Sequence, residues 1–189
     1  SSENELCNTV ATSLLINDRP SAFRYPRGEG IGEKINDKPE IWEIGKGKVI
    51  REGTKVCVLS LGTRLKDSLI ASDVLASYGL STTVVDARFA KPIDELLITQ
   101  LARDHEVLIT VEEGSIGGFS AQVMSFLTKS GALDKGLKYR PIFFPDVFIK
   151  HGKPEKQNSE CGIDSEGIIK TALGALGIAA PTKFSLERA

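Results

Sequence analysis

Two arginines lie three positions apart in the run Arg24-Tyr25-Pro26-Arg27-Gly28. A guanidinium group offers a planar fork of N–H donors that matches the oxygens of phosphate or carboxylate. Pro26 fixes its own φ angle and favours an extended backbone at the residue before it, and Gly28 allows the chain to bend. The run suggests an anion-binding turn. The alternative is that one or both arginines pair with an Asp or Glu of the same protein.

Adjacent carboxylates at Glu112 and Glu113 close an apolar run and precede the glycines Gly114, Gly117 and Gly118. Paired carboxylates can carry out acid–base chemistry, but neighbouring residues on a strand point to opposite faces. We therefore expect no catalytic dyad here. Instead, one of the two carboxylates is expected to hold backbone N–H donors of the glycine-rich turn.

Two further short motifs follow predicted strands. Gly62-Thr63 could bind an anion at a helix N-terminus, but neither GxGxxG nor GxxxxGK[ST] is present, so we interpret it as a strand-to-helix turn. Asp86-Ala87-Arg88-Phe89 begins at a strand C-terminus, where α/β proteins often bind ligands. Asp86 and Arg88 could pair with each other, and we favour fixation of the loop or a contact between domains.

The histidines and cysteines predict no catalytic or metal site. His105 lies between a predicted helix and a predicted strand, where a structural hydrogen bond is expected, and His151 lies in a predicted surface loop. Cys57, within an apolar strand, is expected to be buried, and Cys7 and Cys161 are far from it. No CxxC pair is present, so zinc binding is not expected. No catalytic, cofactor-binding or metal-binding residue is predicted in this chain.

Composition excludes several classes of partner. The net charge of −1 gives no basic footprint for nucleic acid. No apolar run approaches the roughly 20 residues that span a bilayer, and no secretory signal is recognisable, so no membrane partner is expected. Three widely spaced cysteines suggest a reducing compartment. The content of 41% hydrophobic and 26% charged residues is ordinary for a globular protein.

The secondary-structure elements that position these residues follow different patterns before and after residue 40. Before it, we predict a helix over 3–17, a strand over 22–25 and a polar, glycine- and proline-rich linker over 26–40. One helix and one strand cannot bury a core. Residues 1–40 are therefore expected to be the end of another domain, and the chain to be the C-terminal part of a longer polypeptide.

After residue 40, strands and helices alternate. The predicted strands cover 48–50, 56–61, 82–86, 107–111 and 140–144, and the predicted helices cover 65–78, 93–103, 119–130 and 165–176. Such alternation implies βαβ crossovers. We therefore predict an α/β fold with three layers and a mostly parallel sheet. The continuous apolar run at 107–111 is typical of a strand buried on both faces.

The order of several motifs resembles one family over essentially the whole chain. The motifs are Arg24-Tyr25-Pro26-Arg27-Gly28, Gly45-Lys46-Gly47, Leu61-Gly62-Thr63, Asp86 to Asp94, Thr110 to Gly114 with Gly117-Gly118-Phe119, Pro145 to Ile149, and Gly162-Ile163-Asp164. Their sequence is similar to the C-terminal part of the 1-deoxy-D-xylulose-5-phosphate synthase family, thiamine-diphosphate enzymes of the transketolase superfamily.

The resemblance implies a reaction and a domain plan. The reaction condenses pyruvate with glyceraldehyde 3-phosphate and releases CO2, for isoprenoid and thiamine biosynthesis. Residues 1–40 would be the end of the pyrimidine-binding domain plus a linker, and residues 41–189 the transketolase C-terminal domain. Thiamine diphosphate and Mg²⁺ would be bound by residues upstream of this chain. A homodimer is implied, in the bacterial cytoplasm or in the plastid stroma.

The resemblance also implies different roles for the two arginines. Arg27 matches the arginine that contacts the phosphate of glyceraldehyde 3-phosphate, whereas Arg24 is a candidate for a structural or a substrate-binding role. The chain alone is expected to be inactive. One alternative is a β subunit of a 2-oxo acid dehydrogenase, which the Tyr-Pro-Arg-Gly sequence disfavours. The other is a non-catalytic dimerisation or binding module.

Overall fold

A single five-stranded sheet organises the computed structural model, which describes residues 1–26, 28 and 30–180. The strands are β1 (Lys48–Arg51), β2 (Val56–Leu61), β3 (Thr82–Asp86), β4 (Val107–Glu112) and β5 (Lys138–Ile142), in the spatial order β1-β3-β2-β4-β5. Strands β3, β2, β4 and β5 run parallel to one another, and β1 pairs antiparallel with β3 at one edge. The prediction of a mostly parallel α/β sheet is confirmed.

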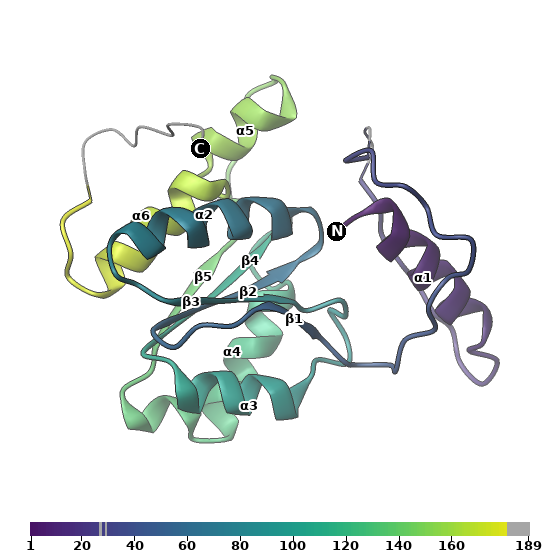
Figure 1. Cartoon of the computed structure of the whole chain (residues 1–189), viewed down its shortest axis with the longest axis horizontal. Helices are drawn as coiled ribbons and strands as arrows, with labels where there is room; N and C mark the ends of the chain where they lie inside the picture. Colours follow the sequence, from purple (N-terminus) through teal and green to yellow (C-terminus); the bar gives the residue numbers. More distant parts are fainter. Residues whose placement is uncertain (27, 29, 181–189) are drawn as a thin grey trace.

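Helices cover both faces of this sheet (Figure 1). The helices are α1 (Glu3–Leu14), α2 (Leu65–Ser77), α3 (Glu95–Asp104), α4 (Phe119–Lys129), α5 (Pro154–Glu160) and α6 (Ser165–Ala175), with 3-10 turns at η1 (Gly62–Arg64) and η2 (Ala132–Lys135). Helices α2 and α6 lie on one face, α3 and α4 lie on the other, and α1 lies to the side of the sheet domain (Figure 1). The expected three layers are present.

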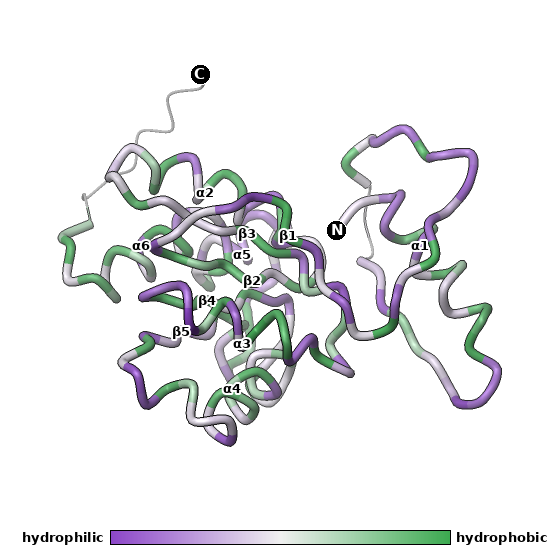
Figure 2. The backbone as a smooth tube through the Cα atoms, turned by 60° about the horizontal axis from the view of Figure 1, so that its bottom comes forward, coloured by the Kyte–Doolittle hydropathy of each residue, from purple (hydrophilic) through white to green (hydrophobic). Residues whose placement is uncertain are grey.

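The core is divided by the sheet into two apolar clusters. Alternate residues of β2 face opposite layers: Val58 packs in the cluster with α2 and α6, and Leu59 packs in the cluster with α3 and α4. All six residues of β4 are buried, which confirms the prediction of an internal strand. The apolar strands β2 and β4 appear green near the middle of the sheet domain in Figure 2.

Two predicted strands differ from the structure, and one helix was not predicted. No strand forms over 22–25, because a lone strand leaves its backbone N–H and C=O groups unpaired. The last strand covers Lys138–Ile142 rather than 140–144, and it includes Pro141, which an edge strand tolerates. The short helix α5 was not predicted, and it carries Pro154 in its first turn.

Helix α1 buries its polar face rather than its apolar one. Asn8 and Thr12 are its buried residues, whereas Leu14 is 74% exposed. Side chains of α1 accept hydrogen bonds from backbone N–H groups of residues 32–42. The pairs, donor first, are Gly32 N to Glu3 Oε1 at 2.7 Å, Asn36 N to Asn4 Oδ1 at 2.7 Å, Glu40 N to Asn8 Oδ1 at 2.8 Å and Trp42 N to Thr12 Oγ1 at 2.9 Å. The C-terminal half of the predicted linker is therefore held along α1.

Within the described residues, no helix combines the length and the apolar character that crossing a membrane requires.

Candidate functional site

Arg24 lies at the carboxyl edge of the sheet. Its Nη2 donates a hydrogen bond to the backbone carbonyl oxygen of Glu113 at 3.3 Å, and the side chain is exposed. Glu113 directly follows β4, so this contact places the first arginine of the two-arginine motif beside the C-terminal end of an internal strand. Arg27, the predicted phosphate-binding residue, lies outside the described residues.

An open groove of about 560 Å³ borders Arg24. One wall is the turn Glu113–Ser115 after β4, and the other is the loop Phe144–Ile149 after β5. Phe148 in that loop is fully exposed and Val147 is 68% exposed. The volume falls within the range of small-molecule sites, about 300–1,000 Å³. Among the candidate residues of the sequence, Arg24 and Glu113 are brought together here.

Glu112 has the structural role that its sequence context suggests. Its buried carboxylate accepts hydrogen bonds from Phe119 N at 3.0 Å, Ser120 N at 2.8 Å and Ser120 Oγ at 2.7 Å. These donors form the start of α4, where a negative charge is favourable. A Cβ atom at Gly118 would lie 2.5 Å from Glu112 Oε2, so the close approach requires glycine there. The prediction that one glutamate holds backbone donors is confirmed, but these donors begin α4 and do not belong to the glycine-rich turn before it.

Glu113 points to a different set of partners. Its Oε1 lies 2.9 Å from Nη2 of Arg64, and Nη1 of Arg64 lies 2.9 Å from Oδ2 of Asp67. The Arg64 side chain is only 14% exposed. Burial raises the pKa of Asp67, while Arg64 and the backbone N–H of Ser165 act in the opposite direction. The two glutamates therefore make no dyad, as predicted.

Arg88 connects the sheet domain to the first forty residues. Its Nε and Nη2 donate to the two carboxylate oxygens of Glu5 at 3.2 Å each, and its guanidinium lies 4.1 Å from the ring centroid of Trp42. Asp86 accepts from the backbone N–H of Arg88 at 3.0 Å and from Ser1 Oγ at 2.7 Å. Arg88 has a φ of 56°, which is costly for a residue with a Cβ. Asp86 thus fixes the loop, as expected.

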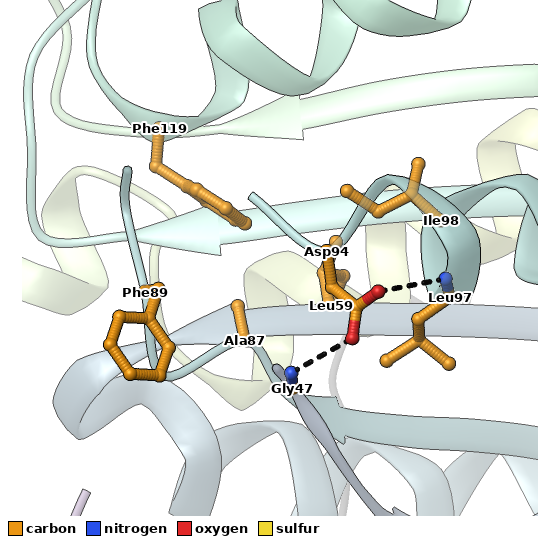
Figure 3. Close-up of a pocket in the computed structure, with 8 residues that line it drawn as sticks. All are labelled: Gly47, Leu59, Ala87, Phe89, Asp94, Leu97, Ile98 and Phe119. Atoms are coloured by element: carbon orange, nitrogen blue, oxygen red, sulfur yellow. Dashed lines mark hydrogen bonds between the residues drawn. The ribbon is translucent and has the colours of Figure 1, made fainter. Parts of the chain in front are cut away.

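A small, partly open space of about 10 Å³ lies between β2, α3 and α4 and the loops beside them (Figure 3). Asp94 bounds it and accepts hydrogen bonds from Leu97 N at 3.0 Å and from Gly47 N at 3.2 Å, drawn as dashed lines in Figure 3. Apolar side chains, among them Phe119, form most of the remaining lining. The space is about that of one water molecule, so it cannot take a substrate.

The remaining candidates have structural positions. His105 Nε2 lies 2.7 Å from Thr83 Oγ1 and its Nδ1 lies 2.9 Å from the Leu101 carbonyl oxygen, which confirms a structural role. His151 is exposed in a loop, as predicted. Cys57 is fully buried, and burial raises the pKa of its thiol. Among the described residues, no three His, Cys, Asp or Glu side chains gather closely enough to hold a metal ion.

Sequence reasoning missed Arg64. Its pairing with Asp67 at the i,i+3 spacing at the start of a helix is a signal that the sequence contains. The pairing of Arg64 with Glu113 leaves no such signal in the sequence, because 49 residues separate the two. The same holds for Arg24 and Glu113, which are 89 residues apart.

Comparison with known proteins agrees with this fold. Residues 45–168 match the family model described as "Transketolase, C-terminal domain". A solved structure described as "Split gene transketolase, inactive beta4 tetramer" is 27% identical with a TM-score of 0.66, and the match covers 75% of this chain. The matched region spans only 45% of that structure's chain. This chain belongs to the transketolase C-terminal domain family.

Proposed function

We propose that this chain is the C-terminal part of a thiamine-diphosphate-dependent synthase. The enzyme condenses pyruvate with glyceraldehyde 3-phosphate to 1-deoxy-D-xylulose 5-phosphate and releases CO2, in the bacterial cytoplasm or the plastid stroma. Family membership supports the enzyme class. The observation that carries the specific reaction is Arg24, which brings the start of the two-arginine motif to the carboxyl edge of this domain, beside a groove.

In this proposal, Arg27 contacts the phosphate of glyceraldehyde 3-phosphate. A charge-assisted contact to phosphate contributes about 1.5–3 kcal/mol. In the full-length enzyme, Arg27→Ala should therefore raise the KM for glyceraldehyde 3-phosphate by about ten- to 150-fold. The KM for pyruvate should change little. Equal effects on both substrates would contradict the phosphate role.

A phosphate-free acceptor makes the test sharper. With glyceraldehyde in place of glyceraldehyde 3-phosphate, wild type and Arg27→Ala should have similar kcat/KM, because the contact that distinguishes them is absent. Arg27→Lys is the matched variant: it keeps the charge but not the planar fork, so its KM should lie between those of wild type and Arg27→Ala.

The division of the chain is part of the proposal. Residues 1–40 would be the end of a pyrimidine-binding domain with its linker, and residues 41–189 the C-terminal domain. The exposed apolar side chains at the end of α1 support this division, because Leu14 and the following Leu15 are 74% and 62% exposed while the polar face of the helix is buried. A preceding domain would cover these leucines. The family match, which begins at residue 45, agrees with the boundary.

Thiamine diphosphate and Mg²⁺ would be held by residues upstream of this chain. The described residues do not fit these groups, because they offer no cluster of metal ligands, and the N–H groups that follow the glycine-rich turn at the start of α4 already donate to the carboxylate of Glu112. When bound, the cofactor supplies a stabilised carbanion. The chain mixed with cofactor, Mg²⁺ and both substrates should form no product, and measurable turnover would contradict this placement.

A second arrangement is favoured by the structural match. The neighbour is described as a split gene transketolase in an inactive beta4 tetramer. By analogy, this chain could act as a β-type subunit, as in a 2-oxo acid dehydrogenase, or form a non-catalytic homo-oligomer when isolated. The intact mass of the native gene product separates this arrangement from a single-chain homodimer. A product near 20.4 kDa would support the subunit.

A further inference from the structure

The residues around Arg24 depend on the sheet domain for their position. Residues 20–26 form no helix or strand and are exposed. Arg24 reaches the sheet domain through its hydrogen bond to the carbonyl oxygen of Glu113. The placement of Arg24 beside the groove therefore depends on how firmly the Glu113–Ser115 turn is held.

This turn is held on two sides. On one face of β4, the buried carboxylate of Glu112 fixes the start of α4. On the other side, the carboxylate of Glu113 is held by Arg64 at 2.9 Å. The side chains of Arg64 and Glu113 are 14% and 33% exposed, so solvent screens their attraction less than that of a surface pair.

Arg64 has the geometry to connect two carboxylates. One terminal nitrogen of its guanidinium faces Glu113 and the other faces Asp67, both at 2.9 Å. Asp67 lies on α2, within the layer that packs on the sheet, so the turn is connected to a rigid element. A lysine could satisfy only one of the two carboxylates well, because its charge is a single point.

We propose that Arg64 is a positioning residue for Arg24, the first arginine of the motif. By holding Glu113, it keeps the Glu113 carbonyl where Arg24 can donate to it. This fixes the Arg24 side chain beside the groove. The kinetic part of this inference depends on the proposed function, whereas the structural part does not.

The structural test uses this chain and trypsin. Trypsin must take the Arg24 side chain to cut the Arg24–Tyr25 bond, so the contact with Glu113 competes with cleavage. In Arg64→Gln, cleavage at this bond should be about two- to tenfold faster, as expected for loss of a hydrogen bond. Cleavage after Lys34 serves as an internal reference, because α1 rather than Arg64 holds that segment. Mass spectrometry distinguishes the two cuts.

Two further variants keep the test decisive. Glu113→Gln removes the charge that Arg64 holds but leaves the backbone carbonyl, and it should accelerate the same cleavage even if Arg64→Gln does not fold. Lys66→Gln is the matched control, because Lys66 is an exposed cation two residues after Arg64, in the first turn of α2. It should cleave at the wild-type rate. If trypsin cuts the Arg24–Tyr25 bond at the wild-type rate in both Arg64→Gln and Glu113→Gln, the proposal is overturned.

The kinetic test uses the full-length enzyme. Arg64→Gln should raise the KM for glyceraldehyde 3-phosphate by about three- to tenfold while kcat and the KM for pyruvate stay within about twofold. Arg64→Lys should restore part of the loss. A merely structural defect would lower kcat and affect both substrates. If cleavage accelerates but Arg27→Ala leaves both KM values unchanged, the positioning role stands and the phosphate assignment fails.

Discussion

Glu5 in α1 and Arg88 after β3 form a two-point ion pair across 83 residues of sequence, with both N···O distances at 3.2 Å. The Arg88 side chain is 8% exposed, and it also lies over the ring of Trp42. The two partners come from the first forty residues and from the sheet domain. This pair therefore connects the segment that carries the two-arginine motif to the domain beside it.

Arg88→Ala should destabilise the chain by about 2–4 kcal/mol. The substitution leaves the carboxylate of Glu5 partly buried without its partner and removes a cation–π contact. Urea unfolding at 25 °C measures the change. The control is Arg103→Ala, which removes an exposed pair with Asp104 and should leave the free energy of unfolding nearly unchanged. Equal losses in the two variants would contradict a special role for Arg88.

Thr12→Val should loosen the segment that runs along α1. Valine has the shape of threonine but cannot accept the hydrogen bond from the buried N–H of Trp42. An unsatisfied buried donor costs about 1–3 kcal/mol, so the Trp42 amide should exchange with solvent at least about fivefold faster. Thr9→Val is the matched control, because Thr9 donates only to a carbonyl within α1. Unchanged exchange at Trp42 in Thr12→Val would show that the segment is held by other contacts.

Glu112→Gln should destabilise the sheet domain by about 2–3 kcal/mol. The amide nitrogen of glutamine would face a backbone N–H where a carboxylate oxygen now accepts. Hydrogen exchange should accelerate first at Phe119 and Ser120. Glu95→Gln changes an exposed carboxylate at the start of another helix, and it should cost less than about 0.5 kcal/mol. If the two variants are equally stable, the Glu112 carboxylate is not needed to start α4.

Acid should weaken the fold through Glu106. Hydrogen bonds from Lys138 and Lys55 lower the pKa of this carboxyl from 4.5 to about 2. Because the folded pKa is the lower one, the unfolded chain binds more protons between these values. The stabilisation is therefore present above pH 4.5 and is lost as the pH falls toward 2. The melting temperature of Glu106→Gln should fall less steeply than that of wild type over this interval.

A second variant checks the cause. Lys138→Gln removes the largest influence on Glu106, so it should also flatten the acid dependence, and Lys55 should preserve part of it. If the melting temperatures of Glu106→Gln and Lys138→Gln both fall with pH as steeply as that of wild type, other carboxylates are responsible for the loss of stability in acid.

The sequence by itself determined the fold class and several local roles. Alternating apolar segments predicted the parallel sheet, and the continuous run before Glu112 predicted an internal strand. That one of the two adjacent glutamates accepts from backbone donors, and that His105 is a structural hydrogen-bonding residue, also followed from local context, whereas the structure decided that this glutamate is Glu112. These predictions succeed because periodicity, turn residues and nearby donors act over a few residues.

Only the tertiary structure decided how distant segments meet. The strand predicted at 22–25 does not form, because strand formation depends on a pairing partner that no local pattern supplies. Helix α1 turns its polar face inward because the 32–42 segment offers backbone donors to Asn8 and Thr12. Arg24 meets Glu113 because the chain returns to the carboxyl edge of the sheet after 89 residues. Spacing in the sequence carries no information about such contacts, because they depend on how whole elements pack.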